Sequence, residues 1–160
     1  MNKKYLLFTF GLLIIFFSKV SFAAVSGQGG GQFHEGYFGI IEINHNGEGE
    51  FVITDSVPLI EGQFYGWVIK LGPGFAKVKW KEVFELPKAP QNWGVEETSG
   101  DYVISEDRKV SVTEGEAFVQ GGYIANYWSV MAGDPPGDYI MHVYVNDHLV
   151  ETFRFRVVNK

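Results

Sequence analysis

The feature that most constrains the fold of this chain is an alternation of apolar and polar side chains that recurs in short segments after residue 33. In residues 76–86, AKVKWKEVFEL, one phase holds alanine, valine and tryptophan, and the other holds three lysines. Successive side chains of a β-strand point to opposite faces, so this segment is predicted to be a strand with one buried and one solvated face. No segment of the sequence sustains a helical period. The alternation therefore predicts an all-β fold.

Glycine, proline, asparagine and aspartate separate the alternating segments at regular intervals, which is typical of a sandwich or a barrel. The predicted strands lie at about residues 34–43, 50–57, 63–71, 76–86, 101–105, 110–119, 123–130, 138–145 and 148–158. About seven to nine such strands are typical of an antiparallel β-sandwich. We assign residues 34–160 to this single domain.

One glutamate lies in the wrong phase of its predicted strand. Glu82 falls between Trp80 and Phe84, on the face that is expected to be buried. Either a β-bulge shifts the register at this point, or a carboxylate points into the core and needs a hydrogen-bonding partner. A bulge costs less free energy than a buried carboxylate, so the bulge is the favoured interpretation.

The first 23 residues have the three-part order of a removable signal peptide. Two lysines precede an apolar run, and Ser21 and Ala23 provide the small side chains that a signal peptidase needs before the cut. We therefore expect cleavage after Ala23 and export to the periplasm or the extracellular space. An uncleaved anchor is the alternative, although the run is short for a membrane span of about 20 apolar residues. Residues 24–33 are predicted to be a glycine-rich linker.

The charge and the cysteine count exclude several classes of function. The chain has no cysteine, which rules out disulfides, thiol chemistry and lipid attachment to an N-terminal thiol. Removing 23 of the 160 residues, three of them lysines, leaves 137 residues with 10 of the 13 basic side chains against 19 acidic ones. Duplex nucleic acid is an unfavourable partner for such an acidic domain. A core of this size can fold without cross-links.

A more specific pattern lies near the C-terminus, in residues 133–158, GDPPGDYIMHVYVNDHLVETFRFRVV. A Pro-Gly-x-Tyr turn opens one strand, and a short turn at Asn146 and Asp147 precedes a final strand of alternating apolar residues. This segment resembles the closing hairpin of bacterial immunoglobulin-like or fibronectin-III-like domains. The resemblance implies an exported immunoglobulin-like β-sandwich, and it carries no activity with it.

A search for catalytic chemistry yields no site. The sequence has no Gly-x-Ser-x-Gly turn, and its histidines include no closely spaced pair on one strand face. The histidines are His34, His45, His142 and His148. We therefore expect no catalytic residue, no metal site and no cofactor. The alternative is a transition-metal site assembled from distant strands.

Two acidic segments leave weaker alternatives open. Residues 44–55 match the spacing of a calcium loop in part, but predicted strands flank them, so an acidic hairpin is the favoured interpretation. Residues 91–101 hold three carboxylates that could flank a glycosidase cleft. Acids in a polar loop are usually solvated, so a catalytic role is not favoured here.

Aromatic residues make up 16% of the chain, and three of them lie where an exposed ring could bind a partner. Trp93 lies in the longest turn-rich segment, and Tyr123 and Tyr127 lie in the run GGYIANYWSV. Flat rings stack on sugars and anchor protein partners. We therefore predict Trp93, Tyr123 and Tyr127 to be ligand-binding residues, with a core position as the alternative for Trp93. The other three tryptophans are expected in the core.

Basic side chains occupy the outward phase of two predicted strands. Lys77, Lys79 and Lys81 belong to one strand, and Arg154 and Arg156 belong to the last one. Neighbouring strands would combine them into a positive patch for an anionic partner. Exposed lysines also discourage aggregation between sheet edges, which is the commoner reason for them.

These patterns favour an exported, non-catalytic binding or adaptor module of the bacterial envelope that engages a protein or a carbohydrate. The alternative is a small exported hydrolase or metal-dependent enzyme whose site is assembled from distant strands. The binding module is favoured because the sequence holds no nucleophile motif, no metal-ligand spacing and no cofactor motif.

Overall fold

The computed structural model describes residues 34–93 and 102–159, and every regular element within them is a β-strand. The strands are β1 (Glu35–Ile43), β2 (Gly49–Ile53), β3 (Ser56–Pro58), β4 (Phe64–Lys70), β5 (Lys77–Glu85), β6 (Tyr102–Ile104), β7 (Val110–Phe118), β8 (Tyr123–Ser129), β9 (Gly137–Val145) and β10 (His148–Val158). Among these residues no helix is long and apolar enough to cross a membrane. The all-β fold that the alternation predicts is confirmed. The predicted leader and linker, residues 1–33, lie outside the described residues.

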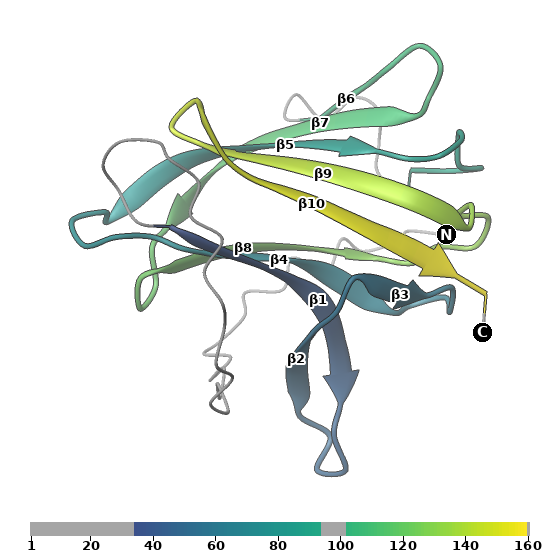
Figure 1. Ribbon diagram of the computed structural model, residues 1–160, viewed down its shortest axis with the longest axis horizontal. Helices are drawn as coiled ribbons and strands as arrows, with labels where there is room; N and C mark the ends of the chain where they lie inside the picture. Colours follow the sequence, from purple (N-terminus) through teal and green to yellow (C-terminus); the bar gives the residue numbers. More distant parts are fainter. Residues whose placement is uncertain (1–33, 94–101, 160) are drawn as a thin grey trace, which may run out of the picture.

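The strands form two stacked sheets, with the β1–β2 hairpin projecting from one of them (Figure 1). One sheet has four strands in the order β2-β1-β4-β8. The other has six strands in the order β3-β10-β9-β5-β7-β6. Neighbouring strands are antiparallel, except that β3 runs parallel to β10. The predicted antiparallel β-sandwich is therefore confirmed, with one parallel pair at an edge.

The chain changes sheets between β2 and β3. The sequence predicts one strand over residues 50–57, but the structure divides this segment at Thr54 and Asp55. The backbone N–H of Arg156 in β10 donates to the carbonyl oxygen of Asp55 at 2.8 Å, and Oγ1 of Thr54 accepts the backbone N–H of Ser56 at 3.1 Å. These bonds fix the crossing point. The division gives ten strands where about seven to nine were predicted.

Aromatic and branched aliphatic side chains fill the space between the sheets. Phe38 of β1 stacks on Phe155 of β10, with ring centroids 4.1 Å apart, and so joins the two sheets. Trp67 is fully buried, and Trp80 and Trp128 pack against the core with part of their surface exposed. The core positions predicted for these three tryptophans are confirmed.

Candidate functional site

Glu82 lies inside the sandwich, and no bulge removes it from the core. The register of β5 with β7 is continuous from Lys77 to Glu85, and the register of β5 with β9 is continuous wherever the two strands pair. The side chain of Glu82 is completely buried. The favoured bulge is therefore wrong, and the other alternative, a buried carboxylate with partners, is correct.

Three side chains of the four-stranded sheet donate hydrogen bonds to the Glu82 carboxylate. The indole N–H of Trp67 in β4 donates to Oε2, and the indole N–H of Trp128 in β8 donates to Oε1 at 2.7 Å. The side-chain amide of Asn126 in β8 donates to Oε2 at 3.4 Å. These bonds supply the partners that a buried carboxylate requires. Because Glu82 belongs to the six-stranded sheet, they also tie the two sheets together through the core.

The Glu82 network offers no room for a substrate. The cavity that adjoins Trp128 has a volume of about 20 Å³, and Glu82 is not among its lining residues. A space of this size holds about one water molecule. We therefore interpret Glu82 as a structural carboxylate and look for the functional site on the surface.

Burial raises the pKa of Glu82 above its ordinary value, although the three donors act in the opposite direction. The folded state then binds the Glu82 proton more tightly than the unfolded state does. This group therefore contributes most stability below pH 4.5 and loses that contribution as the pH rises through its folded pKa.

We expect the free energy of unfolding of the natural protein, minus that of Glu82→Gln, to fall between about pH 4 and neutral pH. The subtraction isolates residue 82 because every other titrating group is common to both proteins. Urea unfolding followed by tryptophan fluorescence at several pH values measures this difference. A difference that is constant or rises with pH would contradict the pKa direction.

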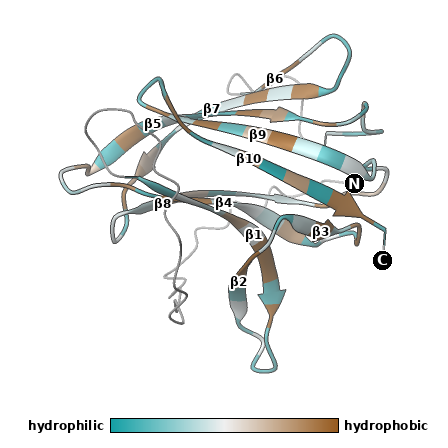
Figure 2. Ribbon diagram, viewed as in Figure 1, coloured by the Kyte–Doolittle hydropathy of each residue, from teal (hydrophilic) through white to brown (hydrophobic). Residues whose placement is uncertain are grey.

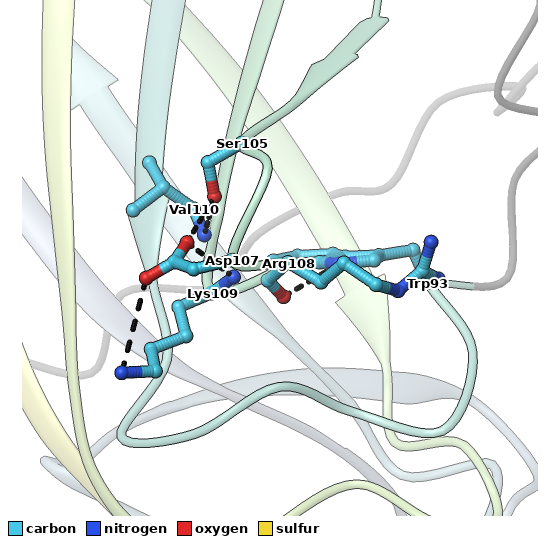
Figure 3. A network of polar contacts seen from close by, with 6 residues as sticks. All are labelled: Trp93, Ser105, Asp107, Arg108, Lys109 and Val110. Atoms are coloured by element: carbon cyan, nitrogen blue, oxygen red, sulfur yellow. Dashed lines mark hydrogen bonds and ion pairs between the residues drawn. The ribbon is translucent and has the colours of Figure 1, made fainter.

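Trp93 is a core residue and not an exposed platform. Its side chain is only 6% exposed, and its ring packs against Tyr102 and Trp128 with centroid separations of 6.4 Å in both cases. Its indole N–H donates to the carbonyl oxygen of Arg108 at 3.0 Å, in the turn between β6 and β7 (Figure 3). This burial leaves no ring face on which a ligand could stack. The position of Trp93 therefore supports the alternative that this residue belongs to the core.

Side chains hold the turn that receives Trp93 (Figure 3). Oδ1 of Asp107 accepts the hydroxyl of Ser105 at 2.6 Å and the backbone N–H of Lys109 at 3.2 Å. Oγ of Ser105 accepts the backbone N–H of Val110 at 3.0 Å. These local bonds fix the carbonyl that receives the indole, so the turn acts as a fixed anchor for Trp93.

Tyr123 and Tyr127 lie together on the outer face of the four-stranded sheet. Both belong to β8, and the residue directly before Tyr127, Asn126, has its side chain turned inward to the Glu82 carboxylate. Tyr127 is partly buried, and this burial raises the pKa of its hydroxyl to about 12. The structure therefore places these two predicted residues on one surface and leaves Trp93 apart from them. Their role in ligand binding stays a prediction.

The ring of Tyr127 lies over Gly66, one of two glycines that face each other in the sheet. Gly39 of β1 and Gly66 of β4 are opposite each other in the sheet, and a Cβ at Gly66 would come within 2.9 Å of the Tyr127 ring. The ring of Phe51 in β2 meets that of Tyr127 edge-on, with centroids 6.2 Å apart and planes at 70°. Two strands separate β2 from β8, so the rings can meet only because the glycines between them have no side chains.

Apolar side chains extend from this ring pair along the projecting hairpin of β1 and β2. They share the outer face of the sheet, and we call them the outer strip: Ile41, Ile43, Phe51, Ile53, Phe64 and Tyr127. Ile43 is 70% exposed, Phe64 48% and Ile53 42%. Figure 2 shows hydrophobic residues on the projecting end of β1. Large exposed apolar patches on a soluble domain mark interaction sites.

The other side of the projecting hairpin is acidic. Glu42 and Glu50 are directly opposite each other in the β1–β2 pair, and both are exposed. Like charges in such a pair destabilise the hairpin by up to about 1 kcal/mol. No ion pair within the described parts of the chain neutralises either carboxylate. The hairpin thus presents an apolar face and a negatively charged face.

The basic rows of the six-stranded sheet do not form one positive patch. Strand β9 separates β5 from β10. Acidic side chains also pair with the bases: Lys77 with Glu116 at 2.5 Å, and Arg156 with Asp138 at 2.6 Å. A groove of about 590 Å³ lies beside this second pair, but the charges that line it already neutralise each other in part. The outer face of this sheet therefore carries alternating charges instead of the single positive patch that neighbouring basic strands would have formed.

Where the structure describes the chain, no three histidine, cysteine, aspartate or glutamate side chains are placed to hold a metal ion. His142 of β9 has its Nε2 atom 3.5 Å from the Glu85 carboxylate. Residues 44–55 form the turn after β1, strand β2 and the two residues that follow it, and Oδ1 of Asn44 accepts two backbone N–H groups of the turn. The calcium-loop alternative therefore lacks its loop geometry. The carboxylates of residues 94–101 lie outside the described residues.

Two stacked sheets, an aromatic core and a closing β9–β10 hairpin define a β-sandwich of the immunoglobulin-like class. The family model described as "PM0630 beta sandwich domain" matches residues 36–158, and the chain belongs to this family. No curated protein matches the sequence.

One solved structure supports the same fold. The chain is similar to the immunoglobulin-like protein PA1606 of Pseudomonas aeruginosa, with 16% sequence identity and a TM-score of 0.50, over 82% of this chain and 100% of that one. A DNA-bound alkylpurine DNA glycosylase, AlkC of Pseudomonas fluorescens, matches with 12% identity and a TM-score of 0.30, over 77% of this chain and 30% of that one. The second likeness is too low to carry an argument. The first shows the fold alone and confirms the immunoglobulin-like resemblance of the sequence.

Proposed function

We propose that the protein is an exported, non-catalytic binding or adaptor module of the bacterial envelope, and that its outer strip engages a protein partner. The observation that carries the proposal is the exposure of Ile43, Ile53 and Phe64 on one continuous face. Covering such a face removes apolar surface from water, which contributes about 25 cal/mol per Å². Export through the predicted leader, residues 1–23, would deliver the domain to the periplasm or the cell exterior.

A protein fits the outer strip better than a carbohydrate does. A sugar needs a flat ring whose face lies open to it, whereas the Phe51 and Tyr127 rings meet edge to face at 70°, so that one ring covers part of a face of the other. The most exposed member of the strip, Ile43, is aliphatic. Aliphatic side chains beside partly buried aromatics are typical of the apolar centre of a protein–protein interface.

The acidic side of the hairpin supports a partner with a basic rim. Glu42 and Glu50 keep like charges together although this destabilises the hairpin, and a basic partner would neutralise both. Such rim charges raise the association rate more than they raise the affinity, and salt weakens their effect. We therefore expect a partner that presents an apolar centre with lysine or arginine beside it.

The proposal is tested by exchanging single exposed side chains and recovering partners from the native envelope fraction. Ile43→Asp is expected to reduce recovery of the partner by about tenfold, because it places a charge in the most exposed part of the outer strip. Phe118→Asp is the matched control, since Phe118 is 71% exposed and lies on the six-stranded sheet. The control is expected to leave recovery unchanged. Quantitative mass spectrometry of the recovered proteins measures both effects.

Equal recovery with Ile43→Asp and with the natural protein would overturn the role of the outer strip. Retention on a glycan column that is lost in Tyr127→Ala but kept in Ile43→Asp would instead identify a carbohydrate ligand. The hydrolase alternative has no observation in its favour within the described residues, because the one fully buried carboxylate, Glu82, lines no cavity there.

A further inference from the structure

Strand β8 is the longest unprotected edge in the sandwich. The four edge strands are β2 with five residues, β3 and β6 with three residues each, and β8 with seven. Natural proteins protect edges with short strands, charges or proline. Strand β3 ends in Pro58 and β2 carries Glu50, whereas the β8 sequence YIANYWS has neither a charge nor a proline. Among the described strands, only β4 pairs with β8, and the other side of β8 carries one bridge within the described residues, between Tyr123 and Gln120 at its start.

The hydrogen bonds at the two ends of β8 show which backbone groups face outward. The N–H of Leu71 donates to the carbonyl oxygen of Gly122 at 2.7 Å, and the N–H of Val130 donates to that of Gln63 at 2.9 Å. Antiparallel ladders alternate between bonded and non-bonded pairs, so even-numbered β8 residues bond to β4. The N–H and C=O groups of the odd-numbered residues of β8 therefore point away from β4. Those of Tyr123 bond to Gln120 in the turn before β8, so Ala125 and Tyr127 are the residues whose backbone is placed to pair at the centre of this edge.

We propose that a second copy of the chain pairs with this edge, β8 against β8 in antiparallel orientation about a two-fold axis at Asn126. Only residues that turn their backbone outward can bond across the axis, which restricts the pairing to a few registers. In the register centred on Asn126, Ala125 of each copy is opposite Tyr127 of the other. Shifting the centre by one residue either way would place two alanines or two tyrosines opposite each other. The centred register is the one that matches a small side chain with a large one.

This pairing joins two four-stranded sheets into one continuous sheet and leaves the members of the outer strip on β1, β2 and β4 accessible in each copy. An isologous contact of this kind closes on itself, so it forms a dimer and not a fibre. No like charges meet across β8, because the strand has none. The net negative charge of the chain opposes association only at long range, where salt screens it. Self-association should therefore strengthen with salt, unlike binding of a basic partner to the acidic hairpin.

Sedimentation velocity of the purified protein over a wide concentration range tests the proposal. We expect a reversible monomer–dimer equilibrium with a dissociation constant that falls as salt is raised. Ala125→Pro removes an outward N–H and is expected to raise the dissociation constant by about tenfold or more. Ala125→Glu keeps the backbone and puts a charge at the junction, so it is expected to weaken the dimer most at low salt.

Ile53→Pro is the matched control, because Ile53 also turns its N–H outward, but at the β2 edge. The N–H of Thr54 donates to the carbonyl oxygen of Phe38, which places residue 53 in the outward phase. This variant is expected to dimerise like the natural protein. A protein that stays monomeric at all concentrations overturns the proposal, and so does a dimer that both Ala125 variants leave intact. If Ala125→Pro fails to fold by circular dichroism, Ala125→Glu decides alone.

Discussion

Replacing Glu82 by alanine is expected to lower the free energy of unfolding by about 3–5 kcal/mol. The change removes the acceptor of the Trp67 and Trp128 indole N–H groups and of the Asn126 amide, and leaves these donors buried without it. It also opens a cavity at a position that is completely buried. Urea unfolding at constant pH measures the effect.

Glu114→Ala is the matched control for this variant. Glu114 lies on the outer face of the neighbouring strand β7, opposite Lys81, and is exposed. A single exposed charge contributes little to stability, so we expect a change of no more than about 0.5 kcal/mol. A loss of under about 1 kcal/mol in Glu82→Ala would show that the carboxylate does not tie the sheets together.

Replacing Gly66 by alanine is expected to prevent stable folding, with a loss on the order of 4 kcal/mol or more. A Cβ at this position would lie 2.1 Å from the carbonyl oxygen of Asn126 and 2.8 Å from the Cα of Tyr127, both of them backbone atoms of β8. Backbone atoms cannot move aside as a flexible side chain can, so β4 and β8 would have to separate. Soluble yield and thermal unfolding measure the outcome.

Gly49→Ala tests the same residue change where space allows it. A Cβ at Gly49 would meet only a methyl group of Ile41, at 3.1 Å, and that side chain can adjust. We expect a change below about 1 kcal/mol. If Gly66→Ala were as stable as Gly49→Ala, the close approach of β4 and β8 would be refuted.

Period-two alternation was enough to predict the strands and the sandwich, because it records which side chains leave water. It could not settle whether the Glu82 carboxylate is buried or displaced by a bulge. The phase of Glu82 was assigned correctly to the buried face, but its partners lie 15, 44 and 46 residues away in the sequence. A local pattern cannot show donors that only tertiary packing brings together, so the less costly local explanation, a bulge, was preferred and was wrong.

The candidate surface was predicted only in part. Tyr123 and Tyr127 were singled out by their clustering, but Trp93, chosen for its turn-rich surroundings, is buried by contacts across the core. The rest of the outer strip was missed because β1 is apolar in both phases: Phe38 faces the core and Ile41 faces outward. Alternation separates the two faces of a strand. When both faces are apolar, it cannot show which one is covered by the other sheet.

The crossing from β2 to β3 gives the projecting hairpin a mechanical connection. Only Thr54 and Asp55 separate the hairpin from β3, which runs parallel to the last residues of β10. A pull on the hairpin, opposed by a tether at the C-terminal end of β10, loads these parallel strands along their length. Their hydrogen bonds lie across the strands, so they would have to shear together and could not open one after another. Tension on a docked partner would thus be borne first by the parallel β3–β10 pair at the edge of the six-stranded sheet.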